Sequence, residues 1–218
     1  GRLLYCYNYP YILPALARYD GTSTFGPLKR WGNFPAISAA WRISQEGFMK
    51  SIPVINDLKL RVEYGTNGNS NANGYYAVLQ SISTGWGNGF LSQNYNNPSM
   101  QWEVDKTLNV GFDLHMLNNR IEVIADAYVK NADKLLATVP HAYLYGGDIS
   151  WSPGYIQWPT TNVGAMQNKG YGITVNTTNI QNKNFTWKTG LNFSVDRNKI
   201  TKLASQINNP WGNAYFIS

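Results

Sequence analysis

Residues 101–116 alternate between apolar and polar side chains, and this pattern constrains the fold more than any other feature of the chain. Successive side chains of a β-strand point to opposite faces, so the segment has one apolar and one polar face. At about 3.3 Å per residue it extends roughly 50 Å, far beyond the usual 5–6 residues. A barrel that crosses a bilayer and projects beyond it needs such strands. Apart from Lys106, the even positions are apolar: Trp102, Val104, Leu108, Val110, Phe112, Leu114 and Met116.

The same two-residue period recurs along the chain and predicts seven strands in all. No segment predicts a convincing helix, and no apolar run reaches the 18 or so residues that a transmembrane helix needs. We therefore expect an all-β chain. The other six predicted strands cover residues 9–19, 35–44, 57–64, 120–130, 169–178 and 185–195.

The predicted connections differ in length, and their order is informative. If the strands alternate in direction, every short connection lies at one end of the sheet and every long one at the other. Outer-membrane barrels have this layout, with short periplasmic turns and long extracellular loops. In the tightest turn, Asn118 and Asn119 suit the positive φ that such turns require. The short connections are 117–120, 179–184 and 45–56, and the long ones are 20–34, 65–100 and 131–164.

Aromatic residues suggest where the apolar faces end. Tyr11 with Tyr19, and Trp102 with Met116, bracket the apolar faces of their strands, as the interfacial girdles of a membrane barrel would. The alternative is that Tyr and Trp are simply favourable residues in strands.

Composition argues against nucleic-acid binding and against a cysteine-based site. The net charge of +6 comes from scattered basic residues without a Lys/Arg cluster, so nucleic-acid binding is not expected. Cys6 is the only cysteine, so neither an intrachain disulfide nor a cysteine-based metal site is expected.

The residues that could carry catalysis do not form a constellation. His115 and His141 are the only histidines, and each is more easily explained as solvated or lumen-lining than as a ligand. Asp105 and Asp113 share a strand face but lie about 26 Å apart, whereas paired glycosidase carboxylates lie within about 10 Å. The chain also lacks a serine nucleophile elbow. We expect no enzyme, no cofactor and no metal site.

Several blocks, in this order and spacing, resemble the barrel of SusC/RagA-type TonB-dependent transporters. The chain departs from the usual pattern at Gly172, where an acidic residue is common, and in the loops at 83–100 and 139–160. The blocks are RYDGTSTFG (18–26), RWGNFPAISAAWRIS (30–44), LKLRVEYGTNGN (58–69), NPSMQWEVDKTLNVGFDLHMLNNRIEVIADAYVKNADKLL (97–136), NVGAMQNKGYGITVNT (162–177) and FTWKTGLNFSVDRNKITKL (185–203).

The resemblance implies an importer in a Gram-negative, Bacteroidetes-type outer membrane that takes up an oligosaccharide or a peptide. A SusD-like lipoprotein would lid the barrel, and a TonB complex would act on it from the periplasm. Seven strands are about a third of a roughly 22-stranded barrel. We therefore expect residues 1–218 to be one segment of the barrel, with the plug domain, TonB box and signal peptide outside it.

Each predicted strand face receives a role under this interpretation. Residues expected to face the lumen or plug are Glu103, Asp105, Asn109, Asp113, Glu122 and Asp126, and those expected to face lipid are Val110, Phe112, Leu114, Ile121, Val123 and Ala125. Aromatic rings in the long loops suit stacking on sugars or peptides, and the candidate ligand contacts are Trp86, Trp151, Tyr155 and Trp158.

Two other interpretations stay open at this point. A soluble β-sandwich lectin or adhesin would turn its apolar faces inward, but the 16-residue strand and the one-sided long loops argue against it. A TonB-dependent receptor for a siderophore or cobalamin would share the barrel, and the loops do not distinguish it from a glycan or peptide importer.

Overall fold

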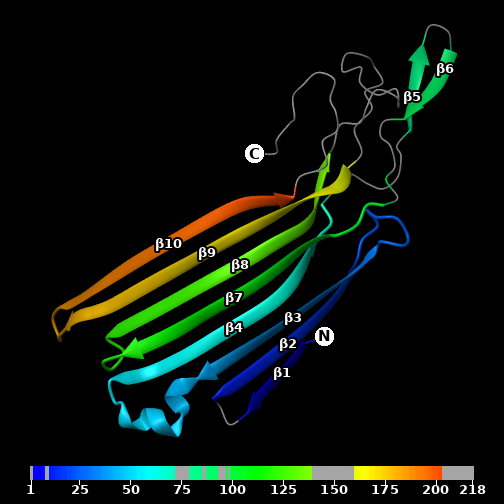
Figure 1. The fold of residues 1–218 in the computed structure, drawn as a ribbon. Helices are drawn as coiled ribbons and strands as arrows, with labels where there is room; N and C mark the ends of the chain where they lie inside the picture. Colours follow the sequence, from blue (N-terminus) through cyan, green and yellow to red (C-terminus); the bar gives the residue numbers. More distant parts are fainter. Residues whose placement is uncertain are drawn as a thin grey trace.

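The alternating segments belong to one antiparallel sheet of eight strands in the computed structural model. The structure describes residues 2–7, 10–71, 79–84, 87–92, 97, 99–138 and 160–202. The strand order is β1-β2-β3-β4-β7-β8-β9-β10, so strands that follow one another along the chain lie side by side (Figure 1). Its strands are β1 (Arg2–Tyr7), β2 (Tyr11–Gly21), β3 (Trp31–Arg42), β4 (Ile55–Asn69), β7 (Glu103–Met116), β8 (Ile121–Thr138), β9 (Thr160–Gln181) and β10 (Thr186–Lys202).

All seven predicted strands are present, and the all-β prediction is confirmed. The structure adds β1 and a separate hairpin, which lies inside the predicted long connection 65–100. Two short 3₁₀ turns occupy the β3–β4 connection. The hairpin consists of β5 (Leu79–Thr84) and β6 (Gly87–Ser92), and the turns are η1 (Ile43–Gln45) and η2 (Gly47–Ser51). None of the described helical segments is long and apolar enough to cross a bilayer.

The two ends of the sheet differ as the connection lengths predict. Short connections join β7 to β8 and β9 to β10 at one end, where η1 and η2 also lie (Figure 1). The connections after β2, β4 and β8 leave from the opposite end. We call these the short-turn end and the rim. In the β7–β8 turn, Leu117, Asn118 and Asn119 all have positive φ, near 53–60°. Asn tolerates this conformation, as predicted, whereas the positive φ of Leu117 was not expected.

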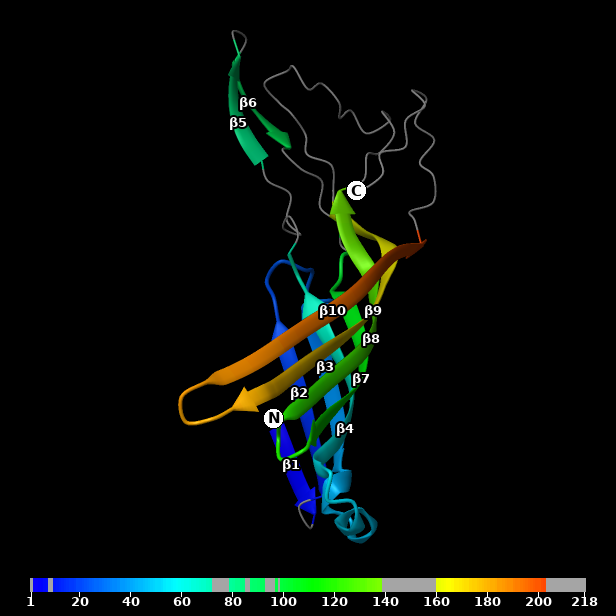
Figure 2. The same cartoon turned by 90° about the vertical axis from the view of Figure 1, so that its left-hand side faces the viewer.

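Strand register places side chains of one kind on one face of the sheet. Val62 of β4 is paired with Val110 of β7, which is paired in turn with Ala127 of β8. The neighbouring row joins Arg61, Gly111 and Asp126. Because faces alternate along each strand, the sheet carries an apolar face and a polar face across most of its width. The sheet also curves, as Figure 2 shows. Its described edge strands are β1 and β10.

The buried side chains gather at the rim rather than along a central layer. Phe25, Phe34 and Met100 are each no more than 3% exposed. The broad apolar face, by contrast, holds many exposed side chains, such as Leu191 at 64% and Val110 at 48%. Such a distribution is the reverse of a soluble sandwich, in which the apolar faces of the sheets form the core.

Candidate functional site

The polar face carries a ladder of ion pairs that crosses β4, β7 and β8. Arg61 Nη2 lies 2.9 Å from Asp113 Oδ1 and 3.0 Å from Asp126 Oδ1, and Lys59 Nζ lies 3.7 Å from Asp113 Oδ2. Arg61 reaches the third strand because Gly111, its partner on β7, has no side chain. A Cβ at Gly111 would overlap the Asp126 carboxylate and approach the Arg61 guanidinium. Gly111 therefore leaves the space in which Arg61 and Asp126 meet.

Further polar pairs extend the ladder on both sides. Lys130 Nζ lies 2.8 Å from Asp105 Oδ2, and the Tyr128 hydroxyl donates to Asp196 Oδ1 at 2.6 Å. Glu122 accepts a hydrogen bond from Asn176 Nδ2 at 2.8 Å, and His115 Nε2 lies 3.9 Å from its other carboxylate oxygen. These bonds join strands β7 to β10 through side chains as well as through the backbone.

The six residues predicted to face the lumen or plug all lie on this polar face by register. Glu103 accepts a hydrogen bond from the Leu136 N–H at 3.3 Å, at the rim end of the face. Asn109 Oδ1 and Arg61 Nε are buried and have no hydrogen-bond partner within the described part of the chain. Both atoms are covered by neighbouring atoms of the sheet itself.

Gly172, where the chain departs from the usual pattern, lies on the same face and is paired with Asp126. A Cβ there would meet Phe193 O at 3.8 Å and Ser194 Cβ at 4.0 Å, which is ordinary contact. The site therefore has room for a side chain. An acidic residue at this position would lie beside Asp126, so the glycine leaves Asp126 without a second carboxylate as its cross-strand neighbour on β9.

The opposite, apolar face holds the six residues predicted to face lipid. They pair across strands with other apolar residues: Val110 with Ala127, Phe112 with Ala125, Leu114 with Val123 and Met116 with Ile121. Toward the rim the same face becomes polar, because it carries Lys106 and Asp133. Their Nζ and Oδ2 atoms form an ion pair at 2.8 Å. The apolar band on β7 thus runs from Leu108 to Met116. At about 3.3 Å per residue this is roughly 26 Å along the strand, close to the apolar band of an outer-membrane barrel.

Aromatic pairs lie at both ends of β2 and β3 on the apolar face. Tyr19 stacks on Trp31 toward the rim, with centroids 5.1 Å apart and planes 2° apart. Tyr11 stacks on Trp41 toward the short-turn end at 6.3 Å. The Tyr11 hydroxyl and Trp41 Nε1 also donate to Glu46 Oε1, at 2.7 and 3.0 Å. Tyr and Trp at the ends of an apolar band are typical of membrane interfaces, where one end of the ring is dry and the other wet.

Trp102 does not belong to such a girdle, and this prediction was wrong. It precedes β7 and packs edge-on against Phe25 and Phe34, with centroids 5.6 and 5.2 Å away. Its indole N–H donates to the Arg30 carbonyl at 3.1 Å. The strand ladder begins only at Glu103, so the preceding residue is not held to the alternation and turns into the buried rim cluster.

A second rim feature was not expected from the sequence. Asn162 of β9 accepts the Gln101 N–H at 2.9 Å, and its Nδ2 donates to the carbonyls of Gln101 and Lys134, at 2.9 and 2.7 Å. Lys134 has φ of 60° at an irregularity in the β8–β9 register. The Asn162 amide thus braces the segment before β7 against a bulge in β8. Neither residue belongs to a periodic pattern that would have revealed it.

The connection between β2 and β3 presents an apolar residue at the rim. Thr22 N–H donates to Arg30 O and Lys29 N–H to Gly26 O, at 3.1 and 2.9 Å, so the turn is closed by its own backbone. Phe25 anchors it in the buried cluster, while Leu28 is 96% exposed. The four predicted ligand contacts, Trp86, Trp151, Tyr155 and Trp158, lie outside the described residues.

These features define the class of protein to which the chain belongs. A curved antiparallel sheet with long strands, a paired polar face and an exposed apolar band is a section of a β-barrel wall. The family model described as "TonB dependent receptor-like, beta-barrel" matches residues 7–215. The chain belongs to this family, as its resemblance to SusC/RagA-type transporters predicts.

Relatives agree with this assignment in sequence and in structure. TonB-dependent receptor P39 of Formosa agariphila is 36% identical over 210 residues, which are 94% of this chain and 19% of that protein. TonB-dependent receptor SusC of Bacteroides thetaiotaomicron is 32% identical over 213 residues, 93% of this chain and 20% of that protein. The RagAB peptide importer in its closed-closed state superimposes with a TM-score of 0.83 at 28% identity, over 95% of this chain and 22% of that one. The chain spans about a fifth of the length of these proteins.

Proposed function

We propose that the chain is part of the barrel wall of an outer-membrane, TonB-dependent importer of a bulky nutrient, either an oligosaccharide or a peptide. The observation that carries the proposal is the opposition of the two faces within a family of TonB-dependent barrels. One face carries paired charges, and the other exposes an apolar band between aromatic pairs. The names of the relatives support the substrate class, because one is SusC and another is a peptide importer.

In this proposal the polar face lines the lumen and contacts a plug domain supplied by the rest of the protein. Partly exposed charged side chains of this face, such as Asp126 and Lys130, would accept and donate hydrogen bonds across that contact. The apolar face meets lipid, and the short-turn end lies in the periplasm.

The rim is the extracellular side, where a SusD-like lipoprotein would close the barrel. Leu28 is suited to this contact because a closed turn holds it fully exposed. Trp86, Trp151, Tyr155 and Trp158 remain our candidates for substrate contact, because flat aromatic faces stack on sugars and on the side chains of peptides. The site performs binding and passage, so we assign no catalytic residue, cofactor or metal.

The test begins with the native, full-length protein. We expect extraction from the source membrane to require detergent and to yield a species several times larger than 24.5 kDa that co-purifies with a lipoprotein. A water-soluble species of about this size would instead restore the β-sandwich lectin interpretation.

Substrate class is tested by deleting the gene for the full-length protein. Growth should fail on one class of glycan or peptide as sole nutrient and recover when the gene is restored. A growth defect seen only under iron limitation, or only when cobalamin is scarce, would favour the siderophore or cobalamin alternative.

A further inference from the structure

The apolar face contains a depression where β2, β3 and β4 adjoin. Its volume is about 580 Å³, within the range of pockets that hold small ligands. It exists because Ala39 is small while large side chains surround it on the same face. The lining residues are Tyr11, Leu13, Ala39, Ala40, Trp41, Leu60 and Val62.

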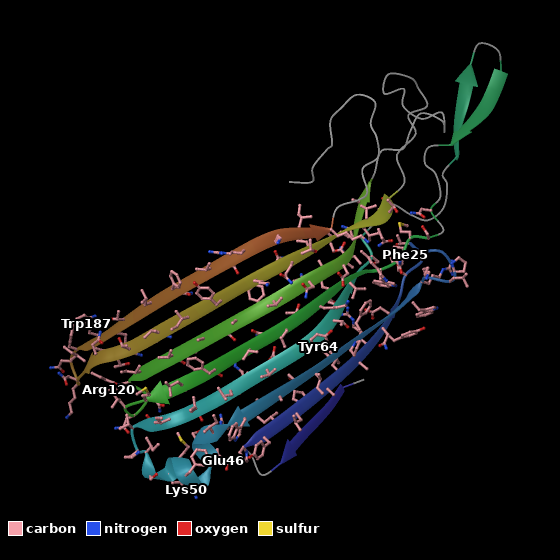
Figure 3. The ribbon with its side chains drawn as sticks, viewed as in Figure 1. Phe25, Glu46, Lys50, Tyr64, Arg120 and Trp187 are labelled. Atoms are coloured by element: carbon pink, nitrogen blue, oxygen red, sulfur yellow. The ribbon has the colours of Figure 1, made fainter. Side chains whose placement is uncertain are left out.

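One end of the depression meets a fixed carboxylate. Tyr11 and Trp41, which line the depression, both donate hydrogen bonds to the same oxygen of Glu46. Both bonds lower the pKa of Glu46, the bond from Tyr11 more than the bond from Trp41. The Glu46 carboxylate is therefore ionised at neutral pH. An anion is thus held at the short-turn end of an apolar depression, and Figure 3 labels it beside Lys50.

The segment that supplies Glu46 also supplies a cation and exposed apolar side chains. Lys50 lies in the last turn of η2. Phe48, Ile52 and Val54 are 61%, 43% and 44% exposed. This segment is suited to the headgroup region of a bilayer, because it combines exposed apolar side chains with a lysine and lies beside aromatic rings. Glu46 and Lys50 therefore supply one negative and one positive charge at the short-turn end of the sheet, where the depression ends (Figure 3).

We propose that this depression binds one phospholipid with an ethanolamine headgroup from the leaflet on the short-turn side. An acyl chain lies over Ala39 between Leu13, Leu60 and Val62. The headgroup ammonium donates hydrogen bonds to Glu46, and the phosphate pairs with Lys50. A choline headgroup carries the same charges but has no N–H to donate, so it binds more weakly. This inference rests on the proposed orientation of the apolar face toward lipid.

The chain offers a closely matched control for this site. Ala39 is paired with Val62, Val62 with Val110, and Val110 with Ala127. Ala127 is therefore an exposed alanine on the same face and in the same row, three strands away from Ala39. Ala39→Trp fills the depression, whereas Ala127→Trp adds the same ring to the face elsewhere.

The experiment counts lipids on the full-length protein in detergent by native mass spectrometry. Phosphatidylethanolamine, phosphatidylcholine or phosphatidylglycerol is added back after delipidation. We expect one tightly held phosphatidylethanolamine on the wild type and on Ala127→Trp, and at least a tenfold loss of affinity in Ala39→Trp. Glu46→Gln should lose the preference for phosphatidylethanolamine over phosphatidylcholine.

Equal occupancy of Ala39→Trp and Ala127→Trp would overturn the proposal, and so would equal binding of all three lipids by the wild type. If Ala39→Trp does not fold, Glu46→Gln alone decides, through the headgroup preference. Heat-modifiable gel mobility reports separately whether each variant is a folded barrel. A folded wild type without a bound lipid refutes this inference alone, whereas a water-soluble wild type refutes the proposed function as well.

Discussion

Glu122 and Val123 are neighbours on β8, yet they lie in different environments. Glu122 accepts a hydrogen bond from Asn176 and lies near His115, on a face where charges are paired across strands. Val123 lies between Leu114 and Val175, on a face that is apolar throughout the band. The comparison teaches that this sheet pairs charged side chains with one another on one face and leaves the apolar side chains of the other face to the surroundings. A bilayer is the solvent in which that arrangement is stable.

The sharpest way to break the comparison is to place a charge on each face in turn. Val123→Arg should destabilise the full-length barrel by about 2–4 kcal/mol if Val123 lies near the bilayer midplane. Glu122→Gln, one residue away, keeps the shape and a hydrogen-bond acceptor and should barely affect folding. Unfolding in lipid vesicles, followed by heat-modifiable gel mobility, measures both. Equal tolerance at the two positions would refute the assignment of the faces.

The ion-pair ladder gives the next largest effect. Arg61→Met should cost about 1–3 kcal/mol, because it leaves the partly buried Asp113 and Asp126 without their shared partner. Lys106→Met removes a more exposed pair with Asp133 and should cost less than about 1 kcal/mol. The same unfolding assay compares them. If the two variants lose the same stability, the ladder is no more than a set of surface pairs.

At the rim a buried aromatic cluster interrupts the alternation of apolar and polar faces. Trp102→Phe tests how much the hydrogen bond of that cluster contributes to stability. The variant keeps an aromatic ring against Phe25 and Phe34 but loses the hydrogen bond to the Arg30 carbonyl. We expect a loss of about 1 kcal/mol and faster proteolysis in the 22–30 connection. Trp31→Phe, in the stacked pair with Tyr19, serves as the control and should leave proteolysis of that connection unchanged.

The smallest effect concerns pH at the short-turn end. The hydrogen bonds from Tyr11 and Trp41 lower the pKa of Glu46 below its ordinary value of 4.5. A lowered pKa in the folded state means that the contribution of Glu46 is complete at neutral pH and fades as pH falls from about 4.5 through the folded-state pKa. Glu46→Gln should remove this small acid dependence, as stability measurements between pH 3 and pH 6 would detect. An unchanged acid dependence in the variant would place its origin in other carboxylates.

The two-residue alternation of apolar and polar side chains made the strands and their faces predictable from the sequence. The alternation in residues 57–64 and 101–116 is read directly as strand and face, because the pleat repeats every two residues. The turn at Asn118 and Asn119 follows from residues that accept positive φ. Most residues of the blocks that carry the family resemblance lie within strands, although the blocks at 18–26 and 97–136 also cover connections.

Contacts at irregular positions were not predictable in this way. Trp102 continues the alternation in sequence but precedes the ladder in space. Asn162 and Lys134 meet through a bulge, and Glu46 joins Tyr11 across 35 residues. Such contacts depend on the register between strands and on the path of a connection, and neither leaves a periodic signal in the residues themselves.

The central claim is that one face of β8 meets lipid while the other faces the interior of a barrel. Spin labels at single cysteines along residues 121–129 of the full-length protein, with Cys6 replaced by serine, test it directly in lipid vesicles. We predict that collisions with molecular oxygen, which concentrates in the bilayer, alternate with a period of two and peak at Ile121, Val123, Ala125, Ala127 and Val129. Maxima at Glu122, Ile124, Asp126 and Tyr128, or no alternation at all, would contradict the account.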